Sequence, residues 1–181
     1  MIVADVEQLA RSGESERLEF KTSTGQLNRA AETLCAFLNA DGGQVLFGIT
    51  PGGEVAGQLV SDSTLRDVAS ALQRFDPPAP VSIERVPLGR SNHEILVLTA
   101  SPTDPPRLFT YDGRPYQRIG TTTSVMPQQQ FQRLLLERVH STQRWENTPA
   151  NFELTDLDAE EILRTLRIGV ATGRLLRLRR P

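Results

Sequence analysis

Residues 26–50 read QLNRAAETLCAFLNADGGQVLFGIT, and this stretch decides the fold. Its first part has apolar residues at helical spacing, which predicts a helix over 26–40 with one buried face. The segment NADGG, residues 39–43, ends that helix with glycine. Residues 44–50 are nearly all apolar, which is typical of a central strand covered on both faces. We therefore expect the helix to lie on this strand, with one shared core formed by Leu34, Phe37, Val45 and Phe47.

The flanking sequence predicts further elements on both sides of this unit. Helical spacing predicts a helix over 3–11, and alternation predicts a short strand over 16–21. After the turn at 51–53 a second strand begins at 54–57, and a helix follows over 62–74. We then expect three more strands and one more helix, at 80–87, 93–100, 114–119 and 127–140. This order predicts an α+β fold, a small mixed β-sheet with helices packed on it.

The C-terminal part differs from the rest in charge. Residues 1–161 hold all 22 acidic residues and 14 of the 20 basic ones, whereas residues 162–181 hold six arginines and no acid. We expect a domain over 1–138, followed over 139–181 by a linker and a helical basic segment, with the linker at 141–155 and the helix at 156–168. The basic segment is either a surface helix with a frayed end or a tail that contacts phosphate groups.

Composition narrows the class of protein. The net charge is −2, and no apolar run reaches the length of a membrane span. The first residues lack the basic start of a signal peptide. Cys35 is the single cysteine, and His93 and His140 lie far apart, so no zinc motif is present in the sequence. We expect a cytoplasmic protein without metal, cofactor or membrane partner.

Four ordered motifs suggest a family. They are ES…LEFK at residues 14–21, AFLNADGG at 36–43, LFGI at 46–49 with the later Gly57, and YQRIG at 116–120 before a threonine run. Together they resemble the Schlafen AlbA_2 domain, also called the divergent AAA_4 domain, over about residues 10–138. The resemblance implies binding to DNA or RNA and a role in regulating transcription. It also implies that two copies can pair as a homodimer.

The same resemblance raises a nuclease alternative. Related folds in animal Schlafens cut transfer RNA with three carboxylates, two of which match Glu14 and Glu19. The third lies in a turn that here reads TPGG, residues 50–53, with no carboxylate before Glu54. Chemically, Glu14 and Glu19 could converge on Mg²⁺ or Mn²⁺ and activate water. In the other interpretation, Glu19 pairs with Lys21 or an arginine. We favour a binding module over a metal-dependent endoribonuclease.

A candidate nucleic-acid face comes from the same motifs. Lys21 ends a strand beside a predicted helix N-terminus, where backbone N–H groups attract anions. Arg114, Tyr116 and Arg118 alternate along a strand and therefore share one face, and Thr121 follows them. Two guanidinium groups beside an aromatic ring suit phosphate contact and base stacking. The alternatives are a sheet face with cross-strand salt bridges, or a face buried against another protein.

The glycines after helix 26–40 have two interpretations. Gly42 and Gly43 are first of all the end of a helix, where glycine adopts a positive φ. They would also let the backbone approach a phosphate closely, so we include both as candidate backbone anion contacts. No GK[ST] sequence follows, so this is not a nucleotide-binding P-loop.

Overall fold

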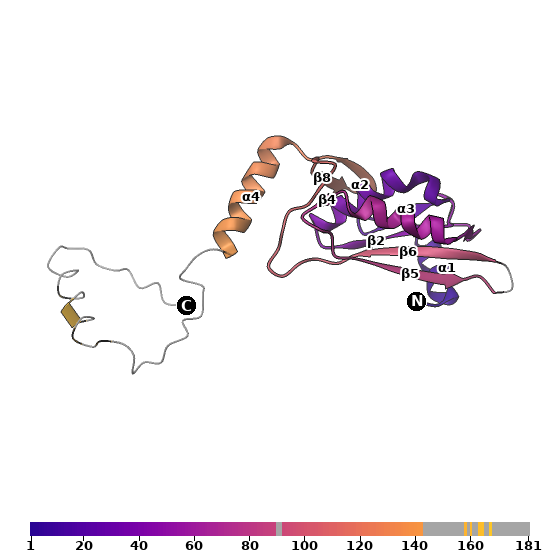
Figure 1. The fold of residues 1–181 in the computed structure, drawn as a ribbon, viewed down its shortest axis with the longest axis horizontal. Coiled ribbons are helices and arrows are strands. Elements are labelled where there is room, and N and C mark those ends of the chain that lie inside the picture. Colours follow the sequence, from indigo (N-terminus) through magenta and orange to yellow (C-terminus); the bar gives the residue numbers. More distant parts are fainter. Residues whose placement is uncertain (90–91, 143–157, 159, 161–162, 165–166, 168–181) are drawn as a thin grey trace. The chain divides into compact units, whose positions relative to one another are not determined.

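The structure is a computed structural model that describes residues 1–89 and 92–142, together with 158, 160, 163, 164 and 167. Residues 1–142 form one compact unit (Figure 1). Most of the linker predicted at 141–155, of the helix predicted at 156–168 and of the basic segment lies outside the described residues. Within the described part of the chain, no helix has both the length and the apolar character needed to cross a membrane.

The helices predicted for this unit and the strands predicted at 16–21, 44–50, 80–87 and 93–100 are present in the predicted order, with further short strands between them. The helices are α1 (Val3–Ser12), the short 3₁₀ helix η1 (Thr24–Gln26), α2 (Leu27–Leu38), α3 (Asp62–Leu72) and α4 (Gln128–Thr142). The strands are β1 (Leu18–Lys21), β2 (Gly43–Phe47), β3 (Gln58–Leu59), β4 (Phe75–Asp76), β5 (Val81–Pro87), β6 (His93–Ala100), β7 (Thr110–Tyr111), β8 (Tyr116–Ile119) and β9 (Thr122–Val125). The predicted α+β class is confirmed.

The main sheet is mixed and has five strands. β1 runs parallel to β2, with Leu18 opposite Gln44, and β2 runs antiparallel to β6. β3 and β5 both pair antiparallel with β6. β1 and β5 therefore lie at opposite edges of the sheet. Two small two-stranded sheets, β4 with β7 and β8 with β9, complete the described strands.

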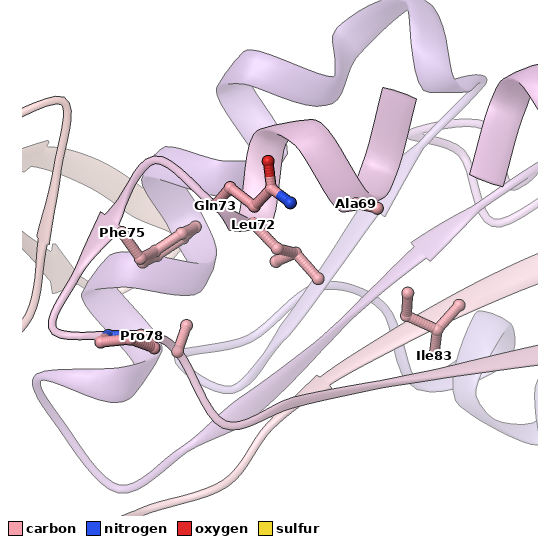
Figure 2. A pocket seen from close by; sticks show the side chains of 7 residues that line it. Ala69, Leu72, Gln73, Phe75, Pro78 and Ile83 are labelled. Carbon is pink, nitrogen blue, oxygen red and sulfur yellow. The ribbon is translucent and has the colours of Figure 1, made fainter. Parts of the chain in front are cut away.

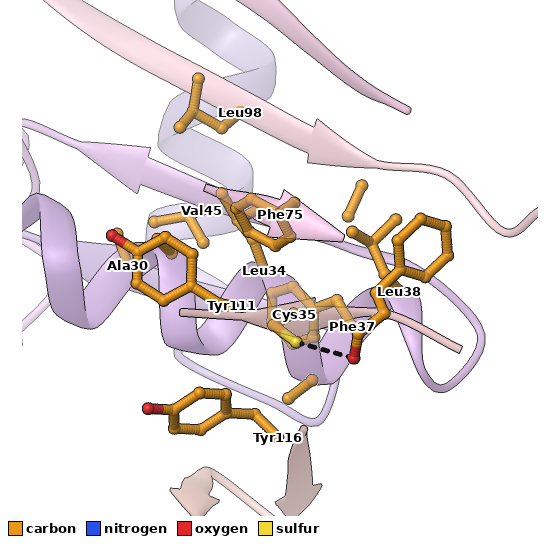
Figure 3. Close-up of a cluster of buried hydrophobic side chains, with 14 of the residues drawn as sticks. Ala30, Leu34, Cys35, Phe37, Leu38, Val45, Phe75, Leu98, Tyr111 and Tyr116 are labelled. Atoms are coloured by element: carbon orange, nitrogen blue, oxygen red, sulfur yellow. Dashed lines mark hydrogen bonds between the residues drawn. The ribbon is translucent and has the colours of Figure 1, made fainter. Parts of the chain in front are cut away.

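The central strand β2 is covered on both faces, as its apolar sequence predicts. Val45 and Phe47 face α2 and join a core with Leu34 and Phe37, all at most 1% exposed. Figure 3 shows Leu34, Phe37 and Val45 in this core. Leu46 points to the other face, where a second core packs α1 against the sheet. The core predicted from residues 26–50 is thus confirmed.

The glycines between α2 and β2 make a close turn. Gly42 has φ 81°, and its N–H donates to the Phe37 carbonyl at 2.9 Å. A Cβ on Gly42 would lie 2.7 Å from the Ala100 carbonyl oxygen, and one on Gly43 would lie 2.7 Å from the Phe37 ring. A larger residue at Gly43 would therefore push β2 away from the helix, and one at Gly42 would collide with the end of β6.

Cys35 and Asn39 tie the end of α2 to later segments. The Asn39 amide nitrogen donates to the carbonyls of Phe109 and Tyr116, at 2.9 and 3.0 Å. The Cys35 thiol donates to the Phe109 carbonyl at 3.3 Å (Figure 3). Burial raises the pKa of this thiol to about 12, so Cys35 is a neutral core residue.

The structure differs from the predicted elements in the short strands. The strand expected at 114–119 begins only at Tyr116, and the threonine run after it forms β9, which the sequence did not predict. β4 and β7 were also not predicted. The strand expected to begin at 54–57 forms only at Gln58–Leu59, and Val55 makes a single isolated bridge with Ile49. Two-residue strands have no measurable periodicity, and a run of threonines lacks the alternation of apolar and polar residues by which strands are recognised.

Candidate nucleic-acid interface

A buried carboxylate organises the candidate site. Glu19 and Lys21 lie on the same face of β1 because side chains alternate along a strand. One oxygen of Glu19 binds the Lys21 ammonium, and the other accepts from the Arg118 guanidinium at 2.6 Å. The side chains of Glu19 and Arg118 are 10% and 3% exposed. Two cations therefore share one carboxylate, which leaves this cluster with a net charge of +1.

Arg118 connects the β8–β9 hairpin to β1. Its guanidinium donates to the Ser15 carbonyl at 2.9 Å and to the Thr123 hydroxyl at 3.1 Å. The same group lies over the Phe37 ring, 5.1 Å from its centroid. Arginine suits this position because its planar group offers several donors and also stacks on an aromatic ring.

A small polar pocket opens beside this cluster. It has a volume of about 150 Å³, and its lining comes from β1, η1, α2 and β9: Glu19, Lys21, Gln26, Arg29, Glu32, Thr33 and Thr123. The Thr33 and Thr123 hydroxyls bind each other at 3.0 Å. Two cations and two carboxylates line the pocket, and Arg118 behind it adds a further positive charge. Such a mixture of cations, hydroxyls and an amide suits a phosphate or a sugar.

The structure brings Lys21 and Arg118 together, as the prediction of a shared groove requires. Arg114 does not join them. It is exposed and precedes β8, in a turn where its backbone bonds to that of Tyr111 at 2.9 and 3.0 Å. Thr121 is exposed at the turn of the β8–β9 hairpin and does not line the pocket.

Tyr116 lies in the core rather than on an open face. It is 7% exposed and packs with α2, and its hydroxyl donates to a Glu32 carboxylate oxygen at 3.3 Å. Burial, followed by the negative charge of Glu32, raises the pKa of Tyr116. In this conformation the ring cannot stack on a base. Tyr116 and Arg118 do lie on one face, but that face is turned toward α2.

The candidate carboxylates do not form a metal centre here. Glu14 accepts from the Phe20 backbone N–H at 2.9 Å, and both oxygens of Glu19 are held by cations. Glu54, the first acid after the turn at 50–53, is exposed. No group of three or more His, Cys, Asp or Glu side chains converges anywhere in the described residues. These donors do not fit a divalent cation, which prefers several carboxylate oxygens free of other partners.

The backbone of the glycine turn is also engaged. The Gly42 N–H is used by the Phe37 carbonyl, so it is not available to an anion. Gly43 begins β2 opposite Ala100, and the Phe37 ring occupies the space beside its Cα. The structure thus favours the interpretation in which both glycines serve packing.

Sequence reasoning missed several residues that line the pocket. Arg29, Glu32 and Thr33 are spaced i, i+3 and i+4, so they share a stripe of α2 beside its buried face. This helical spacing of polar residues is the feature of the sequence from which a shared polar surface could be predicted. No sequence pattern marks Gln26 or Thr123 as a pocket residue. Gln26 lies in a single turn of 3₁₀ helix, and Thr123 lies in a strand that was not predicted.

Comparison with known proteins adds a family to this geometry. The sequence model of the family described as Schlafen, AlbA_2 matches residues 14–127, more than half of the chain. Among solved structures, the DIP2311 protein from Corynebacterium diphtheriae is similar, with 15% identity and a TM-score of 0.49 over 96% of this chain. The match covers 34% of that protein's chain, so the present chain spans about a third of its length. No curated protein matches the sequence.

Proposed function

The chain belongs to the Schlafen AlbA_2 family, and from this premise we propose that it binds nucleic acid by holding backbone phosphates at the pocket beside Glu19. The observation that carries the proposal is the sharing of one buried carboxylate by Lys21 and Arg118. Since Glu19 neutralises only one of the two cations, the cluster keeps a positive charge next to the pocket. Screening confines each charge to roughly 8–10 Å at physiological salt, so this local sign outweighs the acidic body.

The residues in and behind the pocket have different roles in this proposal. Lys21, whose side chain is 14% exposed, reaches the pocket and contacts phosphate. Arg29, whose side chain is 79% exposed, provides a second cation at the rim. Arg118 is too buried to touch a ligand and acts by positioning Glu19 and the hairpin. Thr33 and Thr123 shape the wall of the pocket, because the Thr33 hydroxyl donates to the Arg29 carbonyl at 3.2 Å and the two hydroxyls bind each other.

The test is binding of fluorescent single- and double-stranded DNA and RNA, measured by anisotropy across a salt series. We expect Lys21→Gln and Arg29→Gln each to weaken binding several-fold and to lower the slope of log K against log salt, because each lost phosphate contact releases about 0.7–0.9 fewer counterions. Arg11→Gln is the matched control, since Arg11 is an exposed arginine on α1. Equal affinities for parent, Lys21→Gln and Arg29→Gln would contradict the proposal.

Two finer roles are tested separately, one by comparing ligands in the binding measurement and the other by a cleavage assay. A regulator of transcription requires duplex DNA among the ligands, so tighter binding of duplex DNA than of RNA would support that role. The ribonuclease alternative requires cleavage of transfer RNA with Mg²⁺ or Mn²⁺. We expect no such cleavage, because the oxygens of Glu19 are held by cations and Glu14 holds the backbone of β1. Cleavage that disappears in Glu19→Gln would prove the alternative.

A further inference from the structure

One edge of the main sheet is closed by side chains. β1 pairs with β2 on one side, and its outward backbone groups belong to Leu18 and Phe20. Glu14 accepts from the Phe20 N–H at 2.9 Å, and Arg118 donates to the Leu18 carbonyl at 3.4 Å. Proteins protect sheet edges in such ways because unpaired backbone groups invite another strand. Glu14, a nuclease candidate by sequence, is here part of this edge protection.

The opposite edge, β5, has no such protection. The Leu88 N–H donates to the His93 carbonyl at 2.9 Å, and the register continues from this pair along β5 and β6. Hydrogen-bonded pairs alternate along an antiparallel ladder, so the even-numbered residues of β5 bond to β6. Val81, Ile83 and Arg85 therefore direct their backbone groups outward. The Val81 N–H is used by the Ala79 carbonyl. Within the described part of the chain, no group meets the N–H of Ile83 or Arg85.

The side chains along β5 are also exposed to solvent. Residues 82–85 are exposed, and Ile83 is 41% exposed. Ile83 lines an apolar pocket of about 390 Å³ together with Leu72 at the end of α3 and Phe75 of β4 (Figure 2). An apolar side chain next to free backbone N–H and C=O groups has the two features that favour addition of a strand.

We propose that β5 pairs antiparallel with β5 of a second copy of this chain, around a two-fold axis at Ile83. A symmetric pair requires the same strand on both sides, and residues with outward backbone groups must face one another. In this register each Ile83 N–H donates to the Ile83 carbonyl of the other copy. Each Arg85 N–H donates to the Val81 carbonyl of the other copy. All free N–H groups of the two edges find acceptors, and the two Ile83 side chains meet.

Charge disfavours the registers whose axis lies on the C-terminal side of Ile83, and an axis at Ser82 would separate the two Ile83 side chains. With the axis at Glu84 or at Arg85, two like charges stand directly opposite each other, which destabilises a strand pair. With the axis at Ile83, Glu84 faces Ser82 and Arg85 faces Val81. The strand is therefore complementary to itself, which favours a second copy over an unrelated peptide. Because β5 and β1 are opposite edges, the pairing leaves the pocket at Glu19 uncovered, and the two proposals are independent.

Cysteine cross-linking of the full chain tests both the pairing and its register. Ile83→Cys places two thiols on the axis, within the Cα separation of about 4.4–6.8 Å that a disulfide needs. The native Cys35 is 0% exposed and does not interfere. Under mild oxidation we expect the covalent dimer of Ile83→Cys to form at least ten times faster than that of Glu84→Cys or of Leu59→Cys. Leu59 is a more accessible control, 65% exposed on β3 against 41% for Ile83. Equal rates for the three variants would overturn the proposal, and a faster Glu84→Cys would overturn the register.

Sedimentation provides the second measurement. We expect the parent chain to show a concentration-dependent dimer, and Ile83→Lys to raise its dissociation constant at least ten-fold because two ammonium groups would meet on the axis. Leu59→Lys makes the same change at the exposed control position and should dimerise like the parent. Circular dichroism verifies that both variants are folded. A parent chain that stays monomeric up to millimolar concentration would also overturn the proposal.

Discussion

Asn39 holds together segments that lie far apart in the sequence. Its amide donates to the carbonyls of Phe109 and Tyr116 and accepts from the Phe109 N–H at 2.7 Å. The residue is 7% exposed, so water cannot replace these bonds. Asparagine suits the position because its side chain offers both a donor and an acceptor. The asparagine of the AFLNADGG motif is thus explained by packing, without a ligand.

Replacing Asn39 therefore costs more than a surface change. Asn39→Ala leaves buried backbone groups without partners, at about 1–3 kcal/mol for each, so we expect the free energy of unfolding to fall by at least about 3 kcal/mol. Urea unfolding followed by circular dichroism measures the change. Gln128→Ala, on the exposed start of α4, is the control and should have almost no effect. A loss below about 1 kcal/mol for Asn39→Ala would show that the segments rearrange around the gap.

At the scale of elements, the β8–β9 hairpin is attached to the sheet mainly through one side chain. The two strands pair with each other and not with the main sheet. Arg118 bridges this gap by binding Glu19 on β1 and Thr123 on β9. Tyr116 and Thr123 hold the hairpin to α2, and Arg118 fixes the side of the pocket that β1 forms.

We expect Arg118→Met to loosen the hairpin and to destabilise the fold. Breaking a buried ion pair from one side costs about 3–5 kcal/mol when the remaining charge has no other partner. Here Lys21 still pairs with Glu19, so we expect a smaller loss. Hydrogen exchange should become faster over residues 116–125, while α1 keeps its protection. Arg114→Met is the matched control, since Arg114 is an exposed arginine close in sequence. Unchanged exchange in Arg118→Met would mean that other contacts hold the hairpin.

At the scale of the whole molecule, charge is divided along the chain. Residues 1–161 have a net charge of −8, and residues 162–181 carry six arginines without an acid. The net charge of +1 at the Glu19 cluster is small compared with the charge of these six arginines. If the basic segment contacts phosphates, it contributes to binding through counterion release, which does not require a fixed structure.

Removal of residues 162–181 tests this contribution. We expect lower affinity for duplex DNA and a salt slope reduced by up to about 5, which corresponds to roughly 0.9 for each of six phosphate contacts. A full-length variant with the six arginines changed to glutamine separates charge from length and should match the truncation. An unchanged slope in both variants would show that these arginines are not contacts.

The sequence by itself determined the helices, the longer strands and the layer at the centre of the fold. Periodicity over residues 26–50 is a short-range property, and it predicted both the helix and the doubly covered strand that the structure contains. Alternation also predicted that Tyr116 and Arg118 share a face. It could not predict which way that face points, because alternation is the same for an inner and an outer face.

Tertiary structure decided the site. Arg118 pairs with Glu19 across 99 positions of sequence, and this pairing turns the expected binding face inward and places the pocket next to Lys21. The free edge at β5 and the closed edge at β1 likewise depend on strand order, which arises from packing between distant segments. Local spacing specifies elements, whereas the partner of a buried charge is selected only when the chain has folded around it.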